Sequence, residues 1–252
     1  GRPVTRDDRE MCLPAGEELT ELLPDSLPPL AVDIDGTLTG PDRGLDPRVM
    51  PVCRSWPSTL VVATGKSMPY PVALCEFLGR ETLVIAENGG VVISGPTESI
   101  QFEGSPEKAQ AVVEAYRAEG YTTGWPETDL VNRWRETELA VSRESPLPPL
   151  ERIADEHGLT VVDTGYAYHV KSPDVSKGKA LQTLAGELGL DPEAFAAVGD
   201  SQNDVSTFEV AKRAIAVGNA DDAARAAADR VTAGTYGAGF LDAVHLLRES
   251  VD

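Results

Sequence analysis

Two aspartates, Asp33 and Asp35, end the apolar run that starts at Leu30, and Gly36 follows them directly. Burying an unpaired carboxylate is costly, so this pair either lies on a surface turn or meets a cation and takes part in chemistry. The first carboxylate can attack a phosphorus atom, and the second can protonate the leaving oxygen and then activate a water molecule. Gly36 would let the backbone approach the phosphate closely.

Other polar residues stand where later apolar runs end or where a helix begins: Thr64, Gly65, Lys177, Asp200 and Asp204. The carboxyl ends of parallel strands meet at one edge of a sheet, so we expect these side chains to lie near the two aspartates. Three or four carboxylates cannot all stay ionised there without a cation, and a small set of oxygen ligands suits Mg²⁺. Each short motif alone is also typical of an ordinary turn, but their joint order favours a site for magnesium and phosphate.

The elements expected to position these residues alternate between strand and helix. Continuous apolar runs predict buried parallel strands at 30–34, 59–63, 82–86, 195–198 and 214–217. Helices are predicted at 67–77, 177–188 and 221–228. This alternation predicts an α/β fold with a doubly wound, Rossmann-like parallel sheet.

The segment 89–169 has a different pattern and predicts a smaller α+β cap domain inserted into the core. Its short strand candidates are 91–93, 130–134, 139–141, 159–162 and 166–170, and its helices are 106–119 and 147–157. The core domain is then expected at 30–88 and 170–252. Residues 1–29 are proline-rich and acidic, and we expect them to form a poorly ordered extension.

The chain of 252 residues carries 41 acidic and 22 basic residues, a formal net charge of −19. This sign argues against a nucleic-acid partner, and no apolar stretch is long enough for a membrane span. Three cysteines at wide spacing fit neither a disulfide framework nor a metal site, as is typical of a cytoplasmic protein. Salt at about 1 M shortens the Debye length to about 3 Å, so this charge is tolerable in brine and we expect a salt-adapted protein.

Four short motifs occur in order along the chain: D-I-D-G-T, A-T-G, S-K-G-K and G-D-S-Q-N-D. Together they resemble the motifs of the haloacid dehalogenase superfamily of aspartyl phosphotransferases. The resemblance implies that Asp33 is the nucleophile and a Mg²⁺ ligand. It implies that Asp35 is the acid and base, with its backbone carbonyl on the metal, and that Asp200 and Asp204 complete the Mg²⁺ site.

The same resemblance implies the phosphate-binding residues. Thr64, beside Gly65, would hydrogen-bond the phosphoryl group, and Lys177 would neutralise its charge. Asn203 would support the phosphate or its loop. The expected partner is a small phosphorylated metabolite with Mg²⁺ as cofactor, no nucleic acid and no membrane, and the chain is expected to be a monomer or a homodimer. Ion-pumping ATPases of the superfamily have threonine at the position of Asp35 and span membranes, so the resemblance favours hydrolysis over pumping.

Three further stretches, T-D-L-V-N-R-W-R-E, G-Y-A-Y-H-V and A-E-N-G-G, resemble archaeal-type phosphoglycolate phosphatases, a family with a short cap. A cap that recognises a carboxylate beside a phosphate needs a cation, and arginine offers a bidentate fork. A strand at 130–134 would place Arg133 and Arg135 on one face, where either would bind the carboxylate. The alternative is a cross-strand ion pair with Glu136 or Glu138.

Several functions stay open on the sequence alone. The resemblance favours a Mg²⁺-dependent phosphoglycolate phosphatase; the alternative is a sugar-phosphate or other small-metabolite phosphatase, which in this branch often has a larger cap. A phosphomutase would need a bisphosphate activator, and a non-catalytic binding module would not need a nucleophile beside a proton shuttle. We expect His169 to be a packed strand histidine, and we assign Lys66 no phosphate role.

Overall fold

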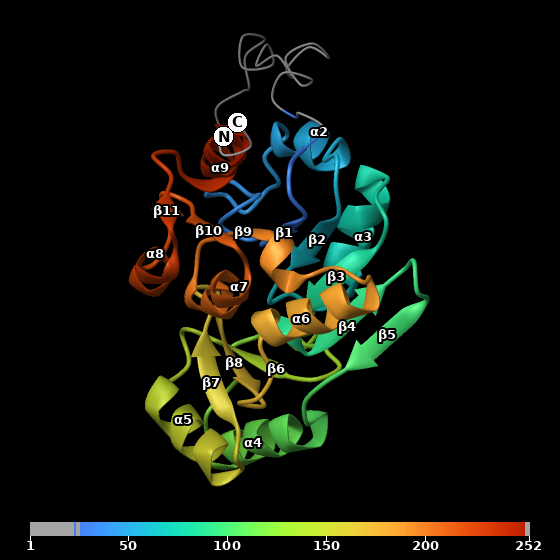
Figure 1. The fold of residues 1–252 in the computed structure, drawn as a ribbon. Coiled ribbons are helices and arrows are strands. Elements are labelled where there is room, and N and C mark those ends of the chain that lie inside the picture. Colours follow the sequence, from blue (N-terminus) through green and yellow to red (C-terminus); the bar gives the residue numbers. More distant parts are fainter. Residues whose placement is uncertain (1–22, 24–25, 250–252) are drawn as a thin grey trace.

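The computed structural model describes Leu23 and residues 26–249 and contains one large sheet with helices on both sides (Figure 1). The strands of this sheet are β1 (Leu30–Val32), β2 (Leu60–Ala63), β3 (Leu83–Ala86), β4 (Val91–Ser94), β5 (Ser99–Phe102), β9 (Ala196–Gly199), β10 (Arg213–Ala216) and β11 (Arg230–Val231). Their order across the sheet is β11-β10-β9-β1-β2-β3-β4-β5. All pairs from β11 to β3 are parallel, and β4 and β5 are added antiparallel. The predicted doubly wound α/β core is confirmed.

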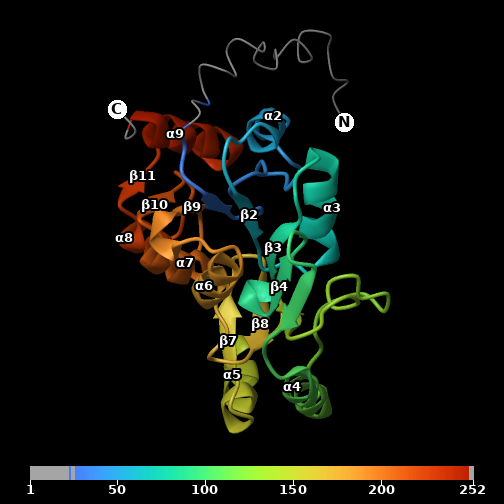
Figure 2. The same ribbon diagram turned by 45° about the vertical axis from the view of Figure 1, so that its right-hand side comes forward.

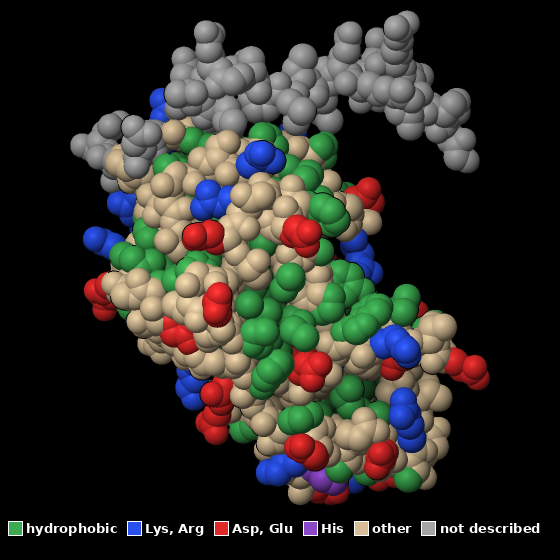
Figure 3. All heavy atoms as spheres, turned by 90° about the vertical axis from the view of Figure 1, so that its right-hand side faces the viewer, with side chains coloured by type: hydrophobic (Ala, Val, Ile, Leu, Met, Phe, Trp, Pro, Cys, Tyr) green, Lys and Arg blue, Asp and Glu red, His purple; other side chains and the backbone are tan. Residues whose placement is uncertain are grey.

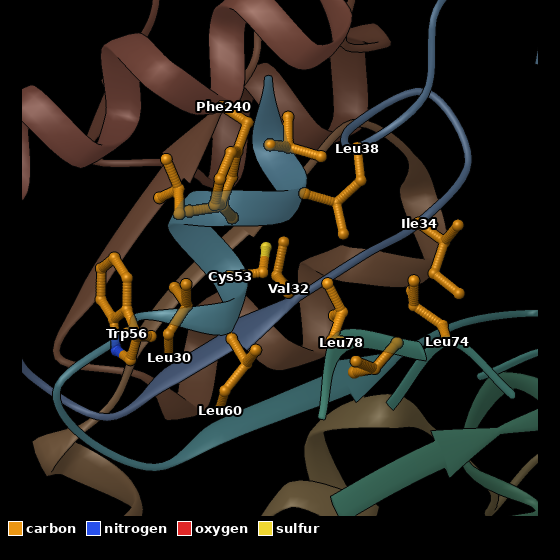
Figure 4. Close-up of a cluster of buried hydrophobic side chains, with 14 of the residues drawn as sticks. Leu30, Val32, Ile34, Leu38, Cys53, Trp56, Leu60, Leu74, Leu78 and Phe240 are labelled. Atoms are coloured by element: carbon orange, nitrogen blue, oxygen red, sulfur yellow. The ribbon is translucent and has the colours of Figure 1, made fainter. Parts of the chain in front are cut away.

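Helices cover both faces of this sheet because successive strand residues point to opposite sides. The core helices are α2 (Val49–Arg54), α3 (Pro69–Leu78), α6 (Lys177–Glu187), α7 (Val205–Val210), α8 (Asp222–Ala227) and α9 (Tyr236–Glu249). Leu30 and Val32 pack with α2, α3 and α9 in the cluster of Figure 4, whereas Ala31 packs toward α6 on the opposite face. None of the helices among the described residues combines the length and apolar character that crossing a membrane requires.

A second, antiparallel sheet lies beside the core and has the order β6-β8-β7. Its strands are β6 (Leu139–Ser142), β7 (Thr160–Asp163) and β8 (Ala167–Lys171). Two helices, α4 (Pro106–Ala118) and α5 (Leu147–Glu156), pack on it through an apolar cluster of their own. We call these five elements and the loops between them the cap. Figure 1 and Figure 2 both place α4 and α5 at the end of the molecule opposite α2 and α9.

The first strand predicted for the insertion belongs to the core sheet instead. β4 pairs with β3, with Val91 opposite Ala86, and β5 extends the sheet by one more strand. The chain reverses between β3 and β4 through a single 3₁₀ turn, η2 (Glu87–Gly89), where Asn88 has a φ of 56° and Gly89 a φ of 103°. A reversal this short keeps consecutive strands adjacent in one sheet. The expected boundary at residue 89 is therefore corrected, since the elements of the cap begin with α4.

The strand predicted at 130–134 is wrong, because this segment forms consecutive turns. Asp129 accepts hydrogen bonds on its carboxylate from the backbone N–H and the side-chain amide of Asn132, both at 3.0 Å. The backbone N–H of Arg133 also turns back to the carbonyl of Asp129, at 3.0 Å. Such local bonds from an aspartate compete with strand pairing, which explains why the apolar residues here did not form a strand.

The predicted extension 1–29 lies mostly outside the described residues. Its described end does not fit a poorly ordered segment, because Leu23 and Leu27 are buried in the core. The indole N–H of Trp56 donates to the carbonyl of Pro28 at 3.0 Å. Apolar packing and this hydrogen bond therefore tie the residues just before β1 to the domain.

The net charge of −19 predicts a stability that depends on salt. Acidic side chains are scattered over the face shown in Figure 3 rather than gathered in one patch. Raising salt from about 0.1 M to 1 M shortens the Debye length from about 10 Å to about 3 Å and screens their repulsion. We expect the midpoint of thermal unfolding to rise by about 5 °C or more, which is about 2 kcal/mol for a chain of this length. Circular dichroism measures this midpoint at low and high concentrations of NaCl and of KCl. A midpoint that does not change with salt would contradict salt adaptation.

Candidate active site

The central strands end beside a buried lysine. Asp33 follows β1 and donates its backbone N–H to the carbonyl of Val198 in β9, at 3.0 Å, while Asp200 follows β9 itself. Lys177, the first residue of α6, has no exposed surface. Its Nζ donates to Asp33 Oδ1 at 2.8 Å and to Asp204 Oδ1 at 2.7 Å. Four of the residues that the sequence predicted at this edge therefore lie together: Asp33, Lys177, Asp200 and Asp204.

Asp33, Asp200 and Asp204 form a carboxylate cluster in which one oxygen of each lies within 4.8 Å of the others. Burial raises the pKa of Asp33 to about 7, although Lys177 opposes the shift. Burial and the neighbouring charge of Asp33 raise the pKa of Asp200 to about 9. Asp200 Oδ1 is buried and finds no hydrogen-bond partner among the described residues. A divalent cation would satisfy this oxygen and displace protons from the cluster, so the donors fit Mg²⁺.

Asp204 holds the loop that carries Asp200. Its Oδ2 accepts hydrogen bonds from the backbone N–H groups of Asp200 at 3.0 Å and Ser201 at 3.1 Å, while its Oδ1 faces Lys177. Asp204 therefore links the Lys177 ammonium to the position of the Asp200 carboxylate.

Gly36 lies against Asp200 at a place where no larger residue fits. Its φ is 83°, and a Cβ atom added there would lie 2.0 Å from Asp200 Oδ2. Asn219 fixes the same peptide by donating its side-chain amide to the carbonyl of Gly36 at 2.9 Å. Gly36 was expected to let a phosphate approach, but its close neighbour in the structure is the Asp200 carboxylate.

The residues predicted to bind phosphate surround the same edge. Thr64 follows β2 and is fully buried, and its Oγ1 accepts a hydrogen bond from the backbone N–H of Lys66 at 3.1 Å. Asn203 donates its side-chain amide to Asn88 Oδ1 at 2.9 Å, which ties the loop after β9 to the turn after β3. Lys66 Nζ lies 3.0 Å from Asp35 Oδ1, so the second aspartate of the pair is bound to a cation from the β2 loop.

A cavity of about 40 Å³ lies between this edge and the cap. The residues that line it come from both parts of the chain and include Asp33, Asp35, Gly65, Lys66, Asn203, Arg135, Tyr166 and His169. The cap strand β8 and the loop before it therefore cover the carboxyl edge of the core sheet. The arrangement places the carboxyl groups of Asp33 and Asp35 and the cationic groups of Lys66 and Arg135 around one small cavity.

Comparison with known proteins gives the family. A family model for haloacid dehalogenase-like hydrolases matches residues 150–244. The chain is 56% identical over 222 residues to a protein of Haloarcula marismortui named phosphoglycolate phosphatase, covering 88% of this chain and 98% of that one. A protein of Archaeoglobus fulgidus with the same name is 37% identical over 220 residues, covering 86% and 96%. This chain belongs to the haloacid dehalogenase-like hydrolases.

A crystal structure from Thermoplasma acidophilum has the same fold as this hydrolase. The two superpose with a TM-score of 0.76 at 25% sequence identity, covering 88% of this chain and 98% of the other. A haloacid dehalogenase-like hydrolase from Bacteroides thetaiotaomicron gives a TM-score of 0.69 at 20% identity over 88% and 100%. Both matches include the cap as well as the core.

In this hydrolase the two arginines predicted to recognise a carboxylate lie in different places. Arg135 lines the cavity and donates from Nη2 to the carbonyl of Gly65 and from Nε to the carbonyl of Val131, each at 3.0 Å. Its guanidinium also forms an ion pair with Glu138. Arg133 lines a separate hollow on the cap. The prediction that both arginines share a strand face is therefore wrong. The alternative of an ion pair with Glu138 holds for Arg135, but the two residues are three apart along the chain rather than on neighbouring strands.

A buried polar network behind Arg135 was not foreseen as part of the site of this hydrolase. Asn88 donates its amide to both oxygens of Glu138, at 3.1 and 3.0 Å, and His169 Nδ1 lies 2.6 Å from Glu138 Oε1. Burial alone would raise the pKa of Glu138, but His169 and Arg135 beside it hold that pKa at about 2. Burial lowers the pKa of His169, and the neighbouring Glu138 carboxylate opposes that shift. His169 is packed in a strand, as expected, and it also borders the cavity.

Glu87 fixes the junction between the core and the cap. Its buried carboxylate accepts hydrogen bonds from the backbone N–H of Glu136, at 2.9 and 3.1 Å, and from the backbone N–H and hydroxyl of Thr137, each at 2.8 Å. In the sequence this place stood out only as the A-E-N-G-G stretch of the family resemblance. The acidic residue in that motif was the available signal, but its partners are backbone N–H groups and a hydroxyl 49 and 50 residues away, which only the fold brings to it.

Proposed function

We propose that this hydrolase cleaves phosphomonoesters through a phosphoryl group carried on Asp33. The observation that supports this most is the position of Asp33, which directly follows the central strand and is bound by the buried ammonium of Lys177. Asp35 lines the same cavity, two residues further along the chain. In this proposal Asp33 is the nucleophile and Asp35 the proton shuttle, and the Lys177 ammonium lies against Asp33.

The reaction takes two steps that use these residues in turn. In the first step a carboxylate oxygen of Asp33 attacks phosphorus, the bond from phosphorus to the alcohol oxygen breaks, and Asp35 gives that oxygen its proton. In the second step Asp35 takes a proton from a water molecule, whose oxygen attacks phosphorus and releases inorganic phosphate from Asp33. Both aspartates return to their starting protonation. The covering cap excludes other water from this space.

A magnesium ion would be held by the carboxylates of Asp33, Asp200 and Asp204 and by the backbone carbonyl of Asp35. The cluster of oxygens and the unsatisfied Oδ1 of Asp200 support this assignment. The bound ion would supply positive charge that offsets the charge of the phosphoryl group. Lys177 contributes charge from the protein side, because it donates to two carboxylates and is fully enclosed.

The substrate we propose is 2-phosphoglycolate, which the enzyme would convert to glycolate and phosphate. Relatives that are 56% and 37% identical over most of their length are named phosphoglycolate phosphatase. The cavity over Asp33 and Asp35 is small, and Lys66 and Arg135 add positive charge to its walls. A short substrate with two anionic ends suits such a space better than a sugar phosphate does.

Phosphate release from a panel of substrates tests this proposal. With Mg²⁺ at high salt, we expect kcat/KM for phosphoglycolate to exceed that for sugar phosphates and phosphoglycerates by at least about tenfold. Chelation of the metal should remove the activity and added Mg²⁺ should restore it. Equal turnover of sugar phosphates would reject the substrate but keep the reaction. A folded protein that releases phosphate from none of them would reject the reaction itself.

A further inference from the structure

Lys66 occupies an unusual place in the cavity wall, at the contact between core and cap. Its Nζ lies 3.0 Å from Asp35 Oδ1, 5.3 Å from the ring centre of Tyr70 and 5.6 Å from that of Tyr166. Tyr70 belongs to α3 of the core, whereas Tyr166 lies in the loop between β7 and β8 of the cap. An ammonium group carries three N–H donors, so its contact with Asp35 leaves two that can bind another acceptor.

The other two cations beside the cavity are committed to the protein itself. Lys177 is fully enclosed, and it binds Asp33 and Asp204. The side chain of Arg135 is 3% exposed, is paired with Glu138 and donates to two backbone carbonyls. The side chain of Lys66 is 22% exposed and its ion pair is with Asp35, a residue that lines the cavity. Lys66 is therefore the cation of the three that is best placed to meet a ligand.

We propose that Lys66 recognises the second anionic group of the substrate, a carboxylate on the alcohol part of the phosphomonoester. This inference rests on the proposed function, in which Asp35 protonates the leaving oxygen. A cation that touches Asp35 lies next to that oxygen. In phosphoglycolate a single methylene group separates this oxygen from the carboxylate carbon. Lys66 can therefore contact the Asp35 side chain and at the same time pair with the carboxylate of the substrate, a charge-assisted contact that a neutral residue at this position would not supply.

The cap holds Lys66 in this position. The ring of Tyr166 borders the cavity, and it receives a second cation, because the guanidinium carbon of Arg43 lies 4.1 Å from the ring centre. Arg43 comes from the core loop after β1 and Tyr166 from the cap, so this contact joins the two parts when the cap covers the site. Cation–π contacts of this kind favour the covered arrangement in which Lys66 faces the substrate.

A pair of matched substrates measures the role of Lys66. The substrates are phosphoglycolate and 2-hydroxyethyl phosphate, which has a neutral hydroxymethyl group in place of the carboxylate. We expect Lys66→Met to lower the ratio of the two kcat/KM values about 10- to 100-fold, the loss of one charged hydrogen bond, mainly through KM for phosphoglycolate. Lys66→Arg should recover part of that ratio. Lys108→Met, an exposed change on α4 with the same loss of charge, should leave the ratio unchanged.

A binding measurement gives the same information without turnover. Calorimetric titration of phosphoglycolate into Asp33→Asn, alone and combined with Lys66→Met, should show affinity lower by a similar factor in the double variant. A fall in activity toward both substrates by the same factor would overturn the inference and leave Lys66 as a partner of Asp35 only. A wild-type enzyme that shows no preference for phosphoglycolate would instead reject the proposed substrate, and with it this inference.

Discussion

Replacing Asp33 with asparagine is expected to lower phosphate release by at least about 10³-fold while the protein stays folded. An amide does not attack phosphorus as a carboxylate does, so the covalent step is lost. The fold should tolerate the change, because burial already disfavours the charged form of Asp33 and raises its pKa to about 7. Asparagine has nearly the same shape without that charge, and Lys177 keeps Asp204 as its partner.

Single-turnover phosphate release measures the loss of activity in Asp33→Asn, and thermal unfolding measures whether the variant stays folded. Asp155→Asn, the same substitution on the exposed side of α5, is the matched control and should keep full activity. Asp35→Asn provides a sharper comparison, because it keeps the nucleophile but lacks the group that activates water. That variant should hold labelled phosphate on the protein after acid quenching, whereas Asp33→Asn should hold none. Substantial activity in Asp33→Asn would assign the attack to another group.

The positions of the central site residues were predictable because they depend mainly on local sequence signals and on the order of neighbouring strands. Asp33 and Asp200 each follow an apolar run, and parallel neighbours such as β1 and β9 must end at the same edge. Lys177 begins a helix whose capping residue, Ser176, is recognisable in the sequence. Local signals and the geometry of a parallel sheet were therefore enough to predict which side chains meet.

The cap was less predictable because its contacts join residues far apart in the chain. Glu138 meets Asn88 and His169, which are 50 and 31 residues away, and these contacts depend on how the cap docks on the core. The arginine-rich loop shows the same limit. Its apolar residues suggested a strand, but bonds from Asp129 form turns, so Arg135 reaches the cavity and Arg133 does not. In a strand, side chains two residues apart point to the same face, so this rule gave Arg133 and Arg135 the same position. It does not apply to a segment that forms turns.

Lys177→Met is expected to abolish turnover and also to destabilise the metal-free protein, which distinguishes it from Asp33→Asn. Lys177 binds Asp33 and Asp204 in a space without solvent exposure, and removing one partner of such buried pairs typically lowers stability by about 3 kcal/mol or more. Both carboxylates would then lack the nearest positive charge. The pKa of Asp33 in the folded protein, already about 7 with Lys177 present, would rise further.

The stability lost in Lys177→Met depends on pH because the pKa of Asp33 is raised. An aspartate with a raised pKa in the folded state holds a proton that the unfolded chain releases near the ordinary value of 3.8, so its contribution to stability falls as pH rises from there through the folded pKa. Urea unfolding in a chelating buffer measures the free energy of unfolding of wild type and of Lys177→Met. The two free energies should differ little at pH 5 and more at pH 8. Added Mg²⁺ should reduce the difference at pH 8, because a divalent cation replaces part of the missing charge. Lys108→Met is the control and should show no such dependence on pH. If Lys177→Met loses the same free energy of unfolding at both pH values, Lys177 acts through packing rather than through its charge on the two aspartates.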